Sequence, residues 1–336
     1  MNPGLPGRIT LFIPSLFVAG EAQRWHAAVQ AGVLARLLAR ANQTANSGLG
    51  HEHRLFSLFG IDSSSSADLP VAAVTRIIDM GVVDRDWWIR ADPVHLEPSR
   101  NGLVLRTGLA LSQGEADSLV AEINQALGAD GWLLKAPSPE RWYLKPAHAV
   151  GIATTPLKDV DGRDIQACLP RGDDSRSWHT RLNEIQILLH TSQVNAGREL
   201  RGMTTANSVW FWGGGSLPAP GSCDWTRVVA NEPLVRGLAR LCSVSCTNTD
   251  AGPKEALDEG RKGNVLVVLD APLQRDSSPL ARIEQEWVKP LKNAVDRGDL
   301  NELTVISDSG PVFQYRRSHR LRFWRLSRAL FTHQAA

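Results

Sequence analysis

The chain of 336 residues is long enough for two domains, and its 43% hydrophobic and 21% charged residues are ordinary for a globular protein. The formal net charge of +2 excludes a strongly basic or acidic protein, so bulk charge predicts neither a nucleic-acid nor a membrane partner. No apolar run approaches the roughly eighteen residues of a membrane span, and the N-terminus lacks the pattern of a secretory signal. The four cysteines form no CxxC pair, which indicates free thiols and a cytoplasmic location.

In chain order, the apolar run Ile9–Ile13 predicts a strand that is buried on both faces. Apolar residues at helical spacing from Trp25 to Leu38 predict the helix that follows it. A strand followed by a helix is typical of a doubly wound α/β domain. Further along, a capping box at Ser112–Glu115 predicts a helix start, and Val265–Leu269 and Leu303–Ile306 predict two more buried strands.

The most informative stretch is Thr205–Pro218, in which an aromatic run typical of a strand leads into three glycines. Consecutive glycines allow backbone amides to approach an anion, and they also allow a tight turn. The stretch therefore predicts either a phosphate-binding loop, with Gly213 and Gly215 as its ligand-binding residues, or a turn at a sheet edge. The glycines alone favour the turn.

This stretch, preceded by Val194, Asn195 and Arg198, resembles the matching segment of the archaeal-type, cofactor-independent phosphoglycerate mutases of the alkaline-phosphatase superfamily. Further similarities follow in the same order along the chain, and they are most specific at 86–145 and 194–240. The resemblance extends to a shorter bacterial subgroup, often labelled phosphoglycerate-mutase-like or RpfE-type regulatory protein.

The resemblance implies an α/β fold with a doubly wound, parallel-sheet domain of the alkaline-phosphatase type at 1–84 and 236–336. A smaller α+β domain would be inserted at 85–235. In the family, arginines of the inserted domain and its hinges bind substrate phosphate and carboxylate, because the guanidinium fork binds such oxygens bidentately. The matching residues here are Arg90, Arg141, Arg198 and Arg236. Ordinary surface ion pairs are the alternative for all four.

The catalytic positions of the family are mostly absent. Mutases of this type use a serine nucleophile and two metal ions, and the nucleophile position falls at Gly50, with Ser47 near but out of register. Only Asp308 and His319 match metal-binding positions, and two ligands do not hold a pair of ions. A loop aspartate and a packed histidine are the alternatives for these two residues.

We therefore predict a degenerate mutase-like protein with no catalytic residue and no metal cofactor, which acts by binding a phosphorylated small molecule or a protein. The alternative is an active, metal-dependent mutase-type isomerase or phosphatase with a Mn or Zn pair. Its replacement ligands would be His51, His53, Asp270 and Asp276. A third alternative is nucleic-acid binding through the six arginines and two aromatic residues of Arg316–Arg328, a stretch too short and mixed to lead.

Overall fold

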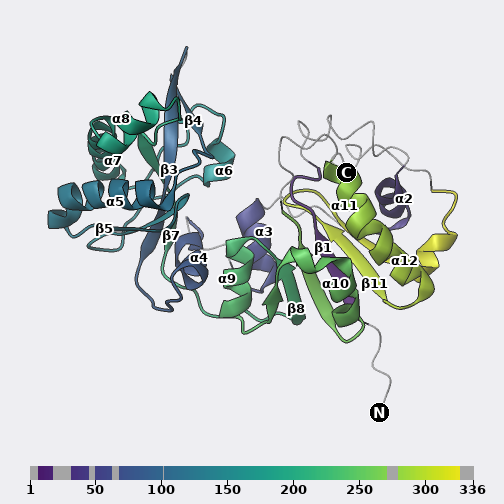
Figure 1. The fold of residues 1–336 in the computed structure, drawn as a ribbon. Coiled ribbons are helices and arrows are strands. Elements are labelled where there is room, and N and C mark those ends of the chain that lie inside the picture. The colour runs from purple at the N-terminus through teal and green to yellow at the C-terminus, as the bar shows by residue number, and fades with distance from the viewer. Residues whose placement is uncertain are drawn as a thin grey trace. The chain divides into compact units, whose positions relative to one another are not determined.

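The computed structural model describes residues 7–17, 32–44, 50–62, 68–100, 102–270 and 279–325. Contacts divide the chain into two compact units (Figure 1). Met1–Asp62 with Pro220–Ala336 form what we call the parallel-sheet unit, and Ser63–Ala219 form the middle unit. The boundaries expected from the sequence, 84/85 and 235/236, lie further along the chain.

Two elements account for this difference in the boundaries. Helix α4 (Val71–Asp79) packs against strands β3 (Trp88–Ser99) and β7 (Ser208–Gly215) and so belongs to the middle unit. Strand β8 (Trp225–Ala230) pairs with β10 (Asn264–Val268) and so belongs to the parallel-sheet unit.

Within the described residues, the parallel-sheet unit has a seven-stranded sheet in the order β2-β12-β11-β1-β10-β8-β9. The parallel strands are β1 (Arg8–Phe12), β10, β11 (Glu302–Ile306), β8 and β9 (Cys246–Thr247). Strands β12 (Val312–Arg316) and β2 (Asn42–Thr44) are antiparallel to their neighbours. The three apolar runs predicted as buried strands are therefore confirmed as the adjacent strands β1, β10 and β11.

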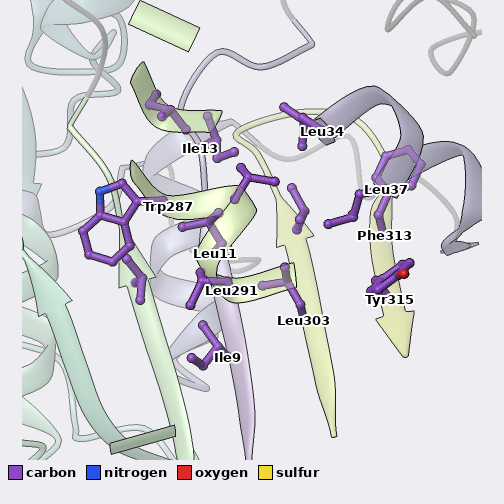
Figure 2. Packing of buried hydrophobic residues seen from close by; sticks show 14 of the residues in the cluster. Ile9, Leu11, Ile13, Leu34, Leu37, Trp287, Leu291, Leu303, Phe313 and Tyr315 are labelled. Atoms are coloured by element: carbon purple, nitrogen blue, oxygen red, sulfur yellow. The ribbon is translucent and has the colours of Figure 1, made fainter. Parts of the chain in front are cut away.

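Helices accompany this sheet, and the main core of the unit lies between the strands β1, β10 and β11 and the helices α2 and α12 (Figure 2). The main helices are α2 (Val33–Arg40), α3 (His51–Leu58), α9 (Pro233–Leu241), α10 (Gly252–Gly260) and α12 (Lys289–Arg297). Helix α12 continues α11 (Pro279–Ile283) through a π-helical turn at Glu284–Val288. In the core, Ile9 and Leu11 of β1 pack with apolar side chains of α2 and α12. Of the helix predicted from Trp25 to Leu38, only the last part lies in the described residues, where α2 confirms it.

The middle unit is an antiparallel sheet with helices, as expected for an inserted α+β domain. The long strand β3 pairs with β4 (Gly102–Arg106), β6 (Arg141–Lys145) and β7, and β5 (Leu133–Ser138) pairs with β6. Its helices are α4, α5 (Gln113–Leu127), α6 (Leu157–Val160), α7 (Ser175–His190) and α8 (Gln193–Leu200). The predicted capping box starts α5, because Ser112 Oγ accepts from Glu115 N at 3.2 Å and the Glu115 carboxylate accepts from Ser112 N at 2.9 Å.

The predicted fold class is confirmed: an α/β unit built on a parallel sheet accompanies a smaller α+β unit. In the described ranges, no helix is both long and apolar enough to cross a bilayer.

Candidate functional site

Polar side chains gather where the parallel strands end. Ser15 follows β1, Glu232 follows β8, Asp270 follows β10 and Asp308 follows β11. In open parallel sheets, ligands bind outside the carboxyl ends of the strands. His51, the first residue of α3, contacts Glu232 and Asp308 and so connects the ends of β8 and β11.

His51 bridges two carboxylates. Its Nε2 lies 2.8 Å from Glu232 Oε1, and its Nδ1 contacts Asp308 Oδ1. The second oxygen of Asp308 accepts from the backbone N of Ser15 at 2.7 Å. A carboxylate only accepts hydrogen bonds and a neutral imidazole has one N–H, so both contacts are satisfied only by the protonated ring.

The electrostatics of the site agree with a protonated His51. Burial alone would lower the pKa of His51, but the charges and hydrogen bonds of Glu232 and Asp308 outweigh it and raise that pKa well above its usual value. The ring also meets the edge of Phe12 at a centroid distance of 5.6 Å. The site therefore contains an internal cation shared by two carboxylates.

The strand-end residues do not fit the metal pair that the resemblance implies. In the part of the chain that the structure describes, no group of three or more His, Cys, Asp or Glu side chains is arranged to hold a metal ion. His51 already engages an oxygen of Asp308 and of Glu232, and Asp270 accepts from Asn231 Nδ2 at 2.8 Å. Of the other two expected replacement ligands, His53 lies half-buried on α3 and Asp276 lies outside the described residues. Ser47 also lies outside the described residues.

The two residual metal-type positions are not brought together. Asp308 lies just after the C-terminal end of β11. His319 lies just after β12, and the last residue of β12, Arg316, pairs with the first residue of β11, Glu302. The antiparallel pairing thus places Asp308 and His319 at opposite ends of β11.

His319 has the environment of a packed histidine. Its side chain is buried, and its Nδ1 accepts from Arg316 N at 3.3 Å. Burial, followed by the charges of Arg322, Arg316 and Arg325, lowers the pKa of His319. The ring is therefore held neutral among arginines, as expected for the packing alternative.

Arg90 lies in the core of the middle unit. It donates to both carboxylate oxygens of Asp92 at 2.7–3.0 Å, and its guanidinium lies 5.2 Å from the ring centroids of Tyr143 and Trp212. Asp92 also accepts from Trp212 Nε1 at 2.7 Å and from Trp142 N at 3.0 Å. Burial raises the pKa of Asp92, against the opposing effect of Arg90. With side chains 6% and 1% exposed, this pair is a structural element of the core.

Arg198 also makes only internal contacts among the described residues. Its side chain is 0% exposed, and it donates to the carbonyls of Thr204 and Leu109 and to Glu115 Oε2 at 2.9 Å. Glu115 has a pKa lowered to about 2, first by its bond from Ser112 N and further by the arginines. Arg198 therefore ties α8 to the start of α5.

Arg141 and Arg236 reach solvent. Arg141 forms a bidentate pair with Asp79 at 2.8 and 2.9 Å, and its side chain remains 34% exposed. Burial alone would raise the pKa of Asp79, but hydrogen bonds from Arg141 and Tyr143 outweigh it and lower that pKa. Arg236 is an exposed residue of α9 in the parallel-sheet unit.

The three glycines at the end of β7 allow close packing in the middle unit. A Cβ added at Gly213 would lie 2.8 Å from Val71 Cβ, and one at Gly215 would lie 2.8 Å from Pro70 Cβ. Both glycines have positive φ, +64° and +153°. The amide of Gly213 donates to Thr154 Oγ1 at 3.1 Å, so it is not directed at an open pocket. Gly213 and Gly215 are thus part of β7, where the pairing with β3 is irregular, so the structure shows neither the expected turn nor an open phosphate-binding loop at these glycines.

Glu232 and Ser15 are site residues that sequence reasoning missed. Ser15 follows the predicted strand Ile9–Ile13, and Glu232 follows β8. Position after a parallel strand is the signal that could have identified them.

Comparison with known proteins gives partial matches. No family model matches the chain. The 2,3-bisphosphoglycerate-independent phosphoglycerate mutase of Methanosarcina mazei is 28% identical over 173 residues, which cover 49% of this chain and 43% of that protein. The enzyme of the same description from Methanothrix thermoacetophila is 37% identical over 124 residues, covering 35% of this chain and 31% of that protein.

Solved structures match over more of the chain. A Pyrococcus horikoshii protein is 15% identical, with a TM-score of 0.54, over 93% of this chain and 87% of that one. A cofactor-independent phosphoglycerate mutase from Thermoplasma acidophilum is 20% identical, with a TM-score of 0.45, over 93% and 90%.

The fold and the strand-end site define an α/β protein with a parallel sheet, a fold shared with the Pyrococcus horikoshii protein. In sequence, part of the chain is distantly similar to the 2,3-bisphosphoglycerate-independent phosphoglycerate mutases, which confirms the resemblance to that family inferred from the sequence. The matched regions span less than half the length of these curated relatives.

Proposed function

We propose that this chain is a degenerate mutase-like protein that works by binding or regulation and does not interconvert phosphoglycerates. The observation that supports this most is the His51 bridge between Glu232 and Asp308. Two carboxylates at parallel-strand ends repel each other and need a cation, and here the chain supplies that cation from α3. Gly50, at the family's nucleophile position, also offers no hydroxyl group.

We propose a small phosphorylated acid as ligand, bound through Arg141. Among the family-type arginines of the middle unit, Arg141 has a partly exposed side chain, whereas Arg90 and Arg198 are buried in internal contacts. An external phosphate or carboxylate would compete with Asp79 for the same guanidinium fork. A protein partner and the bacterial RpfE-type subgroup remain further proposals. A cytoplasmic location is also proposed, and the four free cysteines support it.

The catalytic half of the proposal is tested on protein purified without chelator. We expect no stoichiometric manganese or zinc pair by elemental analysis. We also expect no interconversion of 2- and 3-phosphoglycerate above background, with or without added manganese. Two tightly bound metal equivalents per chain, or manganese-dependent turnover, would overturn this half and support the active alternative.

The binding half is tested by calorimetry with 3-phosphoglycerate. We expect Arg141→Ala to abolish binding and Asp79→Asn to tighten it several-fold, because the internal competitor loses its charge. Arg106→Ala is a matched control, since Arg106 is an exposed arginine of the middle unit paired with Glu97. Absence of binding in the wild type, or equal binding in the Arg141 and Arg106 variants, would refute the ligand assignment.

A further inference from the structure

Residues 316–325, which we call the basic aromatic surface, expose three large apolar side chains. Leu321 is 62% exposed, Phe323 75% and Trp324 65%. The rings of Phe323 and Trp324 meet edge to face at a centroid distance of 5.5 Å. Gathered exposed apolar side chains mark interaction sites more often than scattered ones do.

The charge of this surface is positive. The sequence contains no Asp or Glu after Asp308, whereas six arginines follow it. Arg317 and Arg320 are exposed, and Arg317 makes no hydrogen bond or ion pair within the described part of the chain. The nearby acids are already engaged: Glu302 with Arg316 at 2.7 Å, and Asp296 with Lys292 and Tyr315.

Other arginines fix the surface to the parallel-sheet unit. Arg322 Nη1 donates to the carbonyl of Arg40 at 3.0 Å and to Asn42 Oδ1 at 2.7 Å. Arg325 Nη1 donates to the carbonyl of Ala41 at 3.2 Å, and Arg40 Nη1 donates to the carbonyl of Arg320 at 3.3 Å. The exposed rings therefore lie on an anchored segment, which lowers the entropic cost of binding.

We propose that the basic aromatic surface binds single-stranded nucleic acid. Phe323 and Trp324 would stack on bases, which are accessible in single strands, and Arg317 and Arg320 would hold backbone phosphates. Helices that bind membrane interfaces present a wide apolar face over many residues, whereas this segment has one short 3-10 turn, Arg317–Leu321. The combination of few rings and many arginines favours a nucleic acid over a bilayer. The proposal involves residues remote in sequence from Arg141 and does not depend on the ligand proposed there.

The test is fluorescence anisotropy with labelled oligo(dT) and oligo(U) of about 20 nucleotides, at low and at physiological salt. We expect wild-type binding that weakens as salt rises. Phe323→Ala with Trp324→Ala should weaken it about tenfold or more, since each stacked base contributes substantially. Arg317→Gln with Arg320→Gln should both weaken binding and flatten its salt dependence.

Matched controls lie elsewhere on the chain. Leu200→Ala removes an apolar side chain that is 91% exposed, and Arg240→Gln removes an exposed arginine of α9. Both should leave the affinity unchanged, and circular dichroism verifies folding of every variant. No binding at low salt, or equal losses in the control and test variants, would overturn the proposal. Binding to phosphatidylserine vesicles without binding to either oligonucleotide would overturn it as well and assign the surface to a membrane.

Discussion

His51→Gln removes the cation between Glu232 and Asp308 and keeps a polar side chain of similar reach. The three side chains are 10%, 28% and 15% exposed, so the bridge is mostly shielded from water. Removing one partner of a buried ion pair costs about 3–5 kcal/mol, and we expect about 2–4 kcal/mol of unfolding free energy here because Glu232 is partly exposed. Urea unfolding followed by circular dichroism measures the loss, and hydrogen exchange of α3 locates it.

Two controls separate the charge effect from general damage to α3. His53→Gln alters a histidine on the same helix outside the bridge, and we expect a loss below about 0.5 kcal/mol. Adding Glu232→Gln and Asp308→Asn to His51→Gln should recover at least half of the loss, because the unpaired carboxylates are then neutral. A His51→Gln variant as stable as the wild type, or a His53→Gln variant equally destabilised, would refute the reasoning.

The same bridge predicts the sign of a pH dependence. The pKa of His51 is raised in the folded state, so its stabilisation is complete below the unfolded pKa of about 6.5 and is lost as pH rises through the folded pKa. The difference in unfolding free energy between the wild type and His51→Gln should therefore shrink as pH increases. A difference that grows with pH would contradict a protonated His51.

Three shorter predictions concern the middle unit. Arg90→Ala should cost about 3–5 kcal/mol by leaving Asp92 buried and unpaired, and urea titration should show partial recovery with Asp92→Asn. Gly214→Ala should lower the unfolding free energy by about 1–3 kcal/mol, because the added Cβ would lie 2.7 Å from the Trp87 ring. The control Gly114→Ala has open space around the added Cβ and should not lower the melting temperature. The pKa of Glu115 is lowered to about 2 in the folded state, so its stabilisation is complete above the unfolded pKa of about 4.5 and is lost as pH falls toward 2. The difference in unfolding free energy between the wild type and Glu115→Gln should therefore disappear in acid.

Much of the fold could be predicted because its signals are local. The continuous apolar runs of β1, β10 and β11 indicate strands covered on both faces, and a capping box places the start of α5. The unit boundaries could not be predicted in the same way. Helix α4 has a sequence that suits either unit, and only its long-range packing on β3 and β7 decides the matter.

The candidate site was harder to predict because its bonds are long-range. His51 and Glu232 are 181 positions apart, and their contact depends on which strands are neighbours in the sheet. One local signal was available: Arg90 and Asp92 alternate along β3 and so share a face, which indicates an internal pair before any external ligand. The resemblance identified Arg90 as family-like, but a matched residue type does not show what that residue contacts.

Gly50→Ser separates a missing nucleophile from an altered site. Gly50 is the N-cap of α3 with φ −73° and ψ 177°, and among the described residues an added Cβ meets no heavy atom within 4 Å. Serine therefore fits, and as an N-cap it should stabilise α3 by a few tenths of a kcal/mol, roughly. A serine hydroxyl is a weak nucleophile unless a base or metal activates it, and the adjacent His51 is already protonated and held by two carboxylates. We expect unchanged or slightly raised thermal stability and no phosphoglycerate interconversion with manganese. Manganese-dependent turnover in Gly50→Ser would show that the carboxylates release His51 to bind metal, and that the chain is an enzyme lacking a single side chain.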